Sequence, residues 1–203
     1  MDNQAALPGE ADRDRKVLAR VAAGDAEAFG FLVDRHQRRL LHLCERILGN
    51  PEDARDAAQE VFLKVYRKAA TFQPRGQVFT WLYRIATNHC LNQLRRRRIV
   101  RFVGLSSGSD EAPCELDPPD SGVDPEAALE IRQAWHRTRL SMSRLPANQR
   151  VVLVLAKFEG LTYREIAEVL EISEGAVESR LFRAMRRLTQ ERSLSSHGEN
   201  AQQ

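Results

Sequence analysis

The chain has 203 residues, of which 29% are charged and only 6% aromatic, and its formal net charge is +3. Long runs rich in Ala, Leu, Arg and Glu favour helix over strand, so we expect an all-α protein. The three cysteines lie far apart, and no apolar stretch approaches the roughly 18 residues of a spanning helix, which argues against a disulfide framework, a zinc cluster, a signal peptide and membrane insertion. A cytoplasmic, soluble protein is expected.

The charge is distributed unevenly along the chain. No Lys or Arg occurs between Arg101 and Arg132. The acidic residues that fall there are Asp110, Glu111, Glu115, Asp117, Asp120, Asp124, Glu126 and Glu130. Segment 103–124 is also rich in Ser, Gly and Pro and has no apolar period, so it is predicted to be a flexible acidic linker. Basic residues crowd the flanking parts, as is typical of a protein that meets nucleic acid at two places.

The linker divides the chain into two expected helical domains, each with its own core. The first spans 13–102 and the second spans 125–191. Residues 1–12 and 192–203 are small and polar, and we expect the first of these tails to be disordered and the second to be a loose C-terminal tail.

The first domain is predicted to begin with two amphipathic helices. Asp25 can cap the first helix and Gly49 closes it, while Asn50, followed by a proline, is a natural cap for the second. His36 and Cys44 lie on the first apolar stripe and are interpreted as core or boundary residues rather than reactive groups. The expected core residues are Phe29, Leu32, Val33, His36, Leu40, Leu43, Cys44 and Ile47 in the first helix, and Ala54, Ala57, Ala58, Val61, Phe62 and Val65 in the second.

A turn at 73–76 leads to a third helix, expected from about Val78 to Arg97. Its core stripe comprises Phe79, Leu82, Ile85, Ala86 and His89, and another side carries Trp81, Arg84, Asn88, Asn92 and Arg95. Arginines meet phosphates, aromatic rings stack on unpaired bases and amides can contact base edges. This second side therefore favours a surface for single-stranded or melted DNA over the alternative of a solvated helix face.

The second domain is predicted to open with a helix that Asp124 and a proline begin and that carries Leu129, Trp135 and Leu140. Pro146 then starts an apolar helix, VVLVLAKF, which Gly160 ends. That helix is apolar nearly all round, which predicts a central, buried position.

A helix-turn-helix is expected next. Thr162 and Glu165 form a capping box, and Ser173 caps the following helix. The inward stripe of that second helix comprises Val177, Leu181, Ala184, Met185 and Leu188, and the opposite side carries Gly175, Ser179, Phe182, Arg183 and Arg186. Phe182 could dock a partner protein or press against thymine methyls in a major groove. Glu178 could accept from a cytosine amino group or form a helix-surface ion pair with Arg183 or another arginine.

Three segments in fixed order carry a resemblance: DARDAAQEVFLKVYRKA, then FTWLYRIATNHCLNQLRRRR, then, after the acidic linker, LPANQRVVLVLAKFEGLTYREIAEVLEISEGAVESRLFRAMRRL. Over about residues 13–190 the chain closely resembles bacterial sigma factors of the extracytoplasmic-function group. The resemblance implies two helical domains, sigma regions 2 and 4, that bind core RNA polymerase and recognise promoter DNA and help to open it.

The resemblance also implies site residues. Those expected to bind core polymerase are Asp53, Asp56, Gln59, Glu60 and Phe62. Those expected at the minus-ten element are Arg75, Trp81, Arg84, Asn88, Asn92 and Arg95. Those expected at the minus-thirty-five element are Arg164, Glu178, Ser179, Phe182, Arg183 and Arg186. Arg55 stands where the family usually has an acid, and Glu178 stands where some relatives have a basic residue.

The expected partners are core RNA polymerase, promoter DNA and an anti-sigma factor, and no cofactor or metal is expected. The linker matches a family segment that threads toward the RNA exit path, although a plain tether is the alternative. A helix-turn-helix repressor that acts without joining polymerase is the alternative function, and it would have no need of the surface between Trp81 and Arg98. An enzyme is a poor third, because phosphate-cradling and metal-hydrolase motifs are missing.

The reach of the linker adds a physical constraint. About 18 base pairs between the two promoter elements cover about 60 Å, whereas a flexible tether of about 20 residues averages about 25 Å and spans about 65 Å when fully extended. Both domains can therefore engage one promoter only if polymerase draws the linker out, and the free protein should bind promoter DNA weakly.

Overall fold

The computed structural model describes residues 8–73, 77–102 and 138–199, and within these ranges the chain forms helices and no strand. The helices are α1 (Pro8–Ala22), α2 (Ala26–Leu48), α3 (Pro51–Lys68), the short 3₁₀ helix η1 (Ala69–Thr71), α4 (Val78–Phe102), α6 (Ala147–Lys157), α7 (Tyr163–Leu170) and α8 (Glu174–Glu199), with further helical residues at 138–143. The all-α prediction is confirmed. The linker, Arg75, Leu129 and Trp135 lie outside the described residues.

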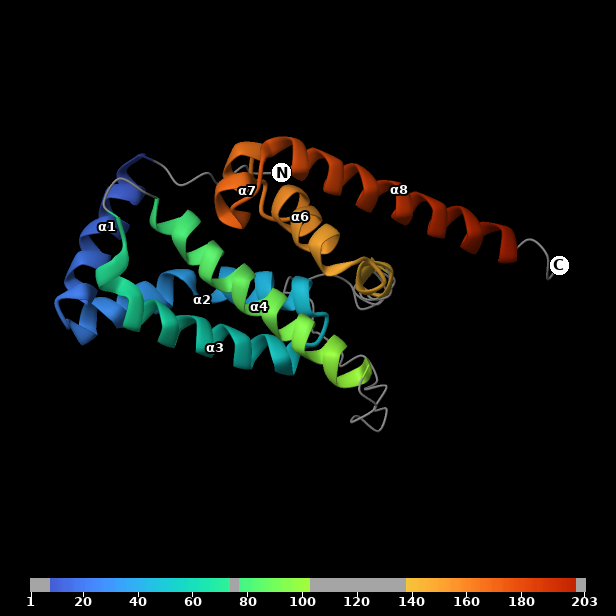
Figure 1. Ribbon diagram of the computed structural model, residues 1–203. Helices are drawn as coiled ribbons and strands as arrows, with labels where there is room; N and C mark the ends of the chain where they lie inside the picture. Colours follow the sequence, from blue (N-terminus) through green and yellow to red (C-terminus); the bar gives the residue numbers. More distant parts are fainter. Residues whose placement is uncertain (1–7, 74–76, 103–137, 200–203) are drawn as a thin grey trace, which may run out of the picture.

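Helices α1 to α4 form the first domain (Figure 1). The predicted caps are confirmed: the Asp25 carboxylate accepts from the amide of Ala28 at 3.0 Å, and Asn50 caps α3 in the same way. Gly49 ends α2 in the left-handed region at φ 78°, where a side chain would be strained. The α3 stripe is buried as expected, and so is the α2 stripe apart from the half-buried Phe29 and Val33.

Helix α1 was missed by the sequence analysis, and it begins inside the segment expected to be a tail. Leu18 and Val21 are buried against the other helices. Asp14, also buried, contacts His36 at 3.1 Å and Arg35 at 2.9 Å, both from α2. The apolar residues three positions apart were the available signal, and they were overlooked because the segment is short and otherwise polar.

Helices α6, α7 and α8 form the second domain. The capping box of Thr162 and Glu165 is confirmed, and Ser173 caps α8 by accepting from the amide of Ala176 at 3.2 Å. Glu171, between α7 and α8, has a left-handed backbone conformation (φ 54°) that turns the chain there. One stripe residue was wrong, because Met185 is 42% exposed. It lies at the edge of the stripe and borders a groove that Lys157 of α6 and Tyr163 of α7 also line. Helix α8 continues to Glu199, past the expected boundary at 191.

The two domains pack directly against each other (Figure 1). Helix α2 contacts α6, and α4 contacts both α6 and α7. The central position predicted for α6 is confirmed, but one side of it is covered by the first domain. The buried residues therefore form one cluster that runs through both domains, not two separate cores. Within the described part of the chain, the helices are all too short or too polar to cross a bilayer.

Candidate nucleic-acid interface

The start of α8 presents an outward face that combines a ring with basic groups. Phe182 is 65% exposed, and Arg183 and Arg186 beside it are also exposed. Ser179 is half-buried and Glu178 is exposed. In the described part of the chain Glu178 forms no ion pair with Arg183, so the intrahelical pairing considered from the sequence is not formed here. An aromatic ring left in solvent among guanidinium groups fits the grooved, anionic surface of duplex DNA.

A groove of about 530 Å³ adjoins this face. Its lining includes Tyr163 from the start of α7, Glu178 and Phe182 from α8, and Lys157 from the end of α6. Arg164, next along α7, is exposed and lies 3.4 Å from Glu168 of its own helix. Such an exposed pair is worth little, so Arg164 can turn toward a phosphate. Three of the residues predicted for the second domain, Glu178, Ser179 and Phe182, thus border one groove.

Helix α4 carries the second candidate face. Asn88, Asn92 and Arg95 are exposed at successive turns of the helix. Trp81 differs from the expectation of an exposed ring: it is half-buried and packs edge-on against Phe72, with ring centroids 5.6 Å apart. Its position is fixed by the segment that follows η1, which the helical pattern of α4 alone could not reveal.

Arg84, on the same helix, is in contact with the second domain. Its Nη2 donates to the backbone oxygen of Glu168 at 2.8 Å, and its Nη1 lies 3.2 Å from the Glu171 carboxylate. Both partners belong to the C-terminal end of α7, where unpaired carbonyls and the helix dipole favour a cation. Arg84 is therefore bonded to the second domain, whereas the other three residues of the α4 face are exposed.

Helix α3 presents the acidic and amide surface. Asp56, Gln59 and Glu60 are exposed, as the sequence predicts. Asp53 is instead held against α4, where it pairs with Arg97 and is 3.5 Å from the Gln93 amide nitrogen. Phe62 is 8% exposed and points into the core, so it positions α3 and offers no surface to a partner.

Two apolar residues of α3 were missed by the sequence analysis. Leu63 is 46% exposed and Tyr66 is 44% exposed. They follow Gln59 by one and two helical turns, and therefore extend the acidic surface along the helix. The available signal was that both residues lie off the core-facing stripe of α3, so the burial of that stripe does not account for them.

Histidine and lysine meet between α3 and α4. Lys64 contacts Nδ1 of His89. Burial lowers the pKa of His89, and the neighbouring Lys64 and Arg96 charges lower it further, against the opposing effect of Glu60. A neutral imidazole can accept from the ammonium group. The contact of His89 with Lys64 therefore joins α4 to α3.

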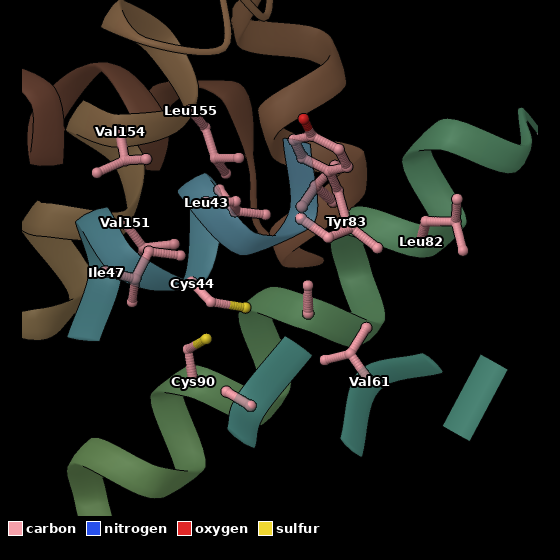
Figure 2. Packing of buried hydrophobic residues seen from close by; sticks show 14 of the residues in the cluster. Leu43, Cys44, Ile47, Val61, Leu82, Tyr83, Cys90, Val151, Val154 and Leu155 are labelled. Atoms are coloured by element: carbon pink, nitrogen blue, oxygen red, sulfur yellow. The ribbon is translucent and has the colours of Figure 1, made fainter. Parts of the chain in front are cut away.

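Cys44 and Cys90 face each other across α2 and α4 (Figure 2). Both are free and fully buried. A hydrogen bond to Cys44 and burial raise the pKa of the Cys90 thiol, which keeps it protonated and unreactive. The expectation that Cys44 belongs to the core is confirmed.

Two family descriptions match the chain in the order of its two domains. Sigma-70 region 2 matches residues 32–99, and Sigma-70 region 4 matches residues 136–188. The RNA polymerase sigma-H factor of Pseudomonas aeruginosa is 36% identical over 177 residues, with 85% of this chain and 90% of that protein covered. The ECF RNA polymerase sigma factor SigW of Bacillus subtilis is 32% identical, with 83% of this chain and 91% of that protein covered.

Solved structures give the same likeness. CnrH in complex with the cytosolic domain of CnrY has a TM-score of 0.62 and 29% identity, and the match covers 89% of this chain and 97% of that chain. The sigma factor RpoE of Bartonella quintana, solved with the anti-sigma factor NepR, has a TM-score of 0.64 and 22% identity, over 80% of this chain and 94% of that chain. The second match shows the fold.

Proposed function

Because this chain belongs to the extracytoplasmic-function (ECF) group of the sigma-70 family of RNA polymerase sigma factors, we propose that it binds core RNA polymerase and directs it to promoters. The two domains, proposed at 13–102 and 125–191, enclose the two matched regions. Catalysis belongs to the polymerase, and the chain supplies recognition in the cytoplasm without a cofactor.

The proposed contacts divide among three helices. The exposed α3 surface of Asp56, Gln59 and Glu60, extended by Leu63 and Tyr66, binds the polymerase. The carboxylates suit a basic partner surface, and the two apolar side chains lose water when they are covered. Asp53 and Phe62 act by holding this helix against its own domain.

The DNA contacts lie on the other two helices. On α4, Asn88, Asn92, Arg95 and Arg84 hold the opened strand of the minus-ten element, beside Trp81 and the segment that contains Arg75. On α8, the minus-thirty-five element meets Glu178, Ser179, Phe182, Arg183 and Arg186, while Arg164 of α7 contacts the backbone.

One observation carries the choice between a sigma factor and a repressor. The chain combines an exposed helix-turn-helix face with a separate amide and arginine face on α4. A repressor needs only the former, since it leaves the duplex closed. A face suited to unpaired bases supports a protein that takes part in DNA opening.

The test is transcription by core polymerase on fragmented genomic DNA of the source organism, with and without the purified chain. We expect new start sites that share upstream sequence elements at a fixed spacing. A set of start sites identical with and without the chain would rule the proposal out. The repressor alternative predicts instead that the chain footprints DNA in the absence of polymerase and only lowers transcription.

An anti-sigma factor is proposed as a further partner. The structures of CnrH and of Bartonella RpoE are complexes with CnrY and with the anti-sigma factor NepR. The likeness to CnrH extends over nearly the whole of that chain, which supports the same type of partner here. Copurification of the chain with a single inhibitory protein from its source organism, and loss of transcription when that protein is added back, would establish it.

A further inference from the structure

A cavity of about 340 Å³ lies where the ends of α2 and α4 meet the start of the second domain. A space of this size falls within the range of small-molecule sites and is larger than a single phosphate ion needs. It is lined by Leu48 of α2, by Leu94, Arg97 and Arg98 of α4, and by Ser143 and Arg150 of the second domain. Among these described lining residues, three carry guanidinium groups and none carries a carboxylate.

Arg150 lines the cavity as a buried cation. Its side chain belongs to a residue that is only 7% exposed. Its Nη1 donates to the backbone oxygen of Ile47 at 2.8 Å, and its Nη2 donates to those of Ser143 at 2.6 Å and Leu145 at 3.2 Å. Its Nε is buried and has no hydrogen-bond partner within the described residues. All three bonds go to neutral carbonyls, so the positive charge itself is not offset.

A buried guanidinium without an anion is costly. Arginine stays protonated in proteins, so it cannot avoid this cost by losing its proton. Burial nevertheless lowers the pKa of Arg150, which reflects the same unfavourable loss of water around the charge. An anion that enters the cavity would offset this charge and could accept from the unpaired Nε. Arg150 therefore points to an anionic ligand.

The two arginines of α4 add to the positive charge of the cavity. Arg97 pairs with Asp53 of α3, whereas Arg98 is exposed and forms no ion pair within the described residues. Glu45 and Arg150 both line a second, much smaller cavity of about 10 Å³, but they form no ion pair with each other in the described part of the chain. One paired carboxylate thus serves three guanidinium groups, which favours a ligand with more than one negative charge.

The lining also indicates the chemistry of that ligand. Guanidinium groups bind phosphate oxygens through paired N–H donors, and several of them together suit a chain of phosphates. Leu48 and Leu94 provide an apolar side on which a planar base can lie. The Ser143 hydroxyl donates to the backbone oxygen of Leu140 at 2.7 Å, so its oxygen can still accept from a ligand.

A free nucleotide fits this lining better than a DNA strand does. Both carry phosphates, but those of DNA are held in a continuous backbone that cannot follow a guanidinium into a buried position. Because Arg150 is only 7% exposed, the terminal phosphate of a small molecule reaches it more easily.

We propose that this cavity binds a free nucleoside polyphosphate. Arg97, Arg98 and Arg150 hold its phosphates, and Leu48 and Leu94 cover its base. These five residues are separate from the polymerase and promoter contacts proposed above. The inference therefore goes beyond the proposed function and does not depend on it.

The first experiment is calorimetric titration of the full chain at physiological ionic strength, without Mg²⁺, which would mask the phosphates. The probes are ATP, GTP, inorganic tripolyphosphate and inorganic phosphate. At least one of the two nucleotides is expected to bind at a single saturable site, more tightly than tripolyphosphate and much more tightly than phosphate. No saturable binding of ATP or GTP would overturn the proposal. Equal affinity for nucleotide and tripolyphosphate would overturn the base-binding role of Leu48 and Leu94.

Two variants test which residues hold the phosphates. Arg98→Gln replaces an exposed side chain without an ion pair in the described residues, so it leaves the packing intact. Arg150→Lys keeps the buried charge but removes the Nε and the planar fork. Each is expected to weaken nucleotide binding about tenfold or more, because a charge-assisted hydrogen bond is lost. Arg96→Gln, at an exposed position of the same helix outside the cavity lining, is the matched control and should bind like the wild type.

The control separates a built site from general attraction to a basic helix. Equal weakening by Arg96→Gln and Arg98→Gln would overturn the site, and so would wild-type affinity in both Arg98→Gln and Arg150→Lys. Circular dichroism checks that every variant stays helical. A mixed-sequence single-stranded DNA pool is the competitor, and it is expected to leave nucleotide bound at Arg98 and Arg150. Displacement by DNA that both variants abolish would assign the cavity to DNA and overturn the proposal.

Discussion

Helices α4 and α8 both carry arginines on an outward face, yet the structure leaves the two faces in different states. Arg84 of α4 is engaged by the second domain through Glu168 and Glu171. Arg183 and Arg186 of α8 are exposed and form no ion pair within the described residues. The comparison teaches that the direction of a side chain on its helix does not determine its availability. The α8 arginines are accessible in this structure, whereas Arg84 of the α4 face is already bonded to the second domain.

The largest expected effect is a loss of stability when the packing between the two domains is weakened. Leu155→Ala removes a fully buried side chain of α6 that packs near Leu43 of the first domain (Figure 2). We expect the free energy of unfolding to fall by about 2–5 kcal/mol, measured by urea denaturation. Leu140→Ala, at a 40% exposed position, is the control and should cost much less. Equal losses in the two variants would contradict the assigned core.

The next effect concerns the α8 face alone. Phe182→Ala combined with Arg183→Ala is expected to lower transcription from a cognate promoter at least about 30-fold, because each of the two lost base contacts costs about 1 kcal/mol or more. Thermal stability should stay close to that of wild type, since Phe182 is 65% exposed. Arg144→Ala removes another exposed arginine, which does not belong to α8, and serves as control. Normal transcription in the double variant would remove α8 from promoter recognition.

A smaller effect is expected on the α4 face. Asn88→Ala removes one exposed amide and should slow DNA opening about tenfold, as measured by permanganate reactivity of unpaired thymines. Binding to the closed upstream element should be unaffected, which separates this variant from the α8 variant. Asn148→Ala, an exposed asparagine of α6, is its control. Equal opening by both variants would show that α4 does not hold the melted strand.

The smallest expected effect is a pH dependence of stability that arises from His89 of α4. Because the pKa of His89 is lowered in the folded chain, the unfolded state binds more protons once the pH falls below about 6.5. Stability should therefore decrease as the pH falls through that value, down to the lowered folded pKa. His89→Gln should flatten the profile of unfolding free energy between pH 7 and pH 5. A slope identical to that of wild type would exclude His89 as the cause.

Local features were predictable from the sequence, and contacts between domains were not. The caps at Asp25, Asn50 and Thr162, and most of the apolar stripes, depend on neighbours within one or two turns, so spacing and residue type sufficed. The exposure of Phe182 followed from the same helical geometry.

The features that sequence patterns did not reveal share a physical cause. Trp81 is half-buried because its ring packs against Phe72. Asp53 pairs with Arg97, which lies on another helix far along the chain. Glu159 gave no signal at all, since a glutamate before a glycine at a helix end is ordinary until Arg46 and Tyr83 are brought to it. Such contacts depend on the relative placement of helices, which no periodicity encodes.

The most direct measurement of the central claim is gel filtration of the dye-labelled chain with core RNA polymerase at low micromolar concentration. A polymerase specificity subunit is expected to coelute with the core, and the charge-reversed variant Asp56→Lys, on the exposed α3 surface, should coelute less. Elution of the folded wild-type chain entirely apart from the polymerase, in the absence of any inhibitory protein, would contradict the account.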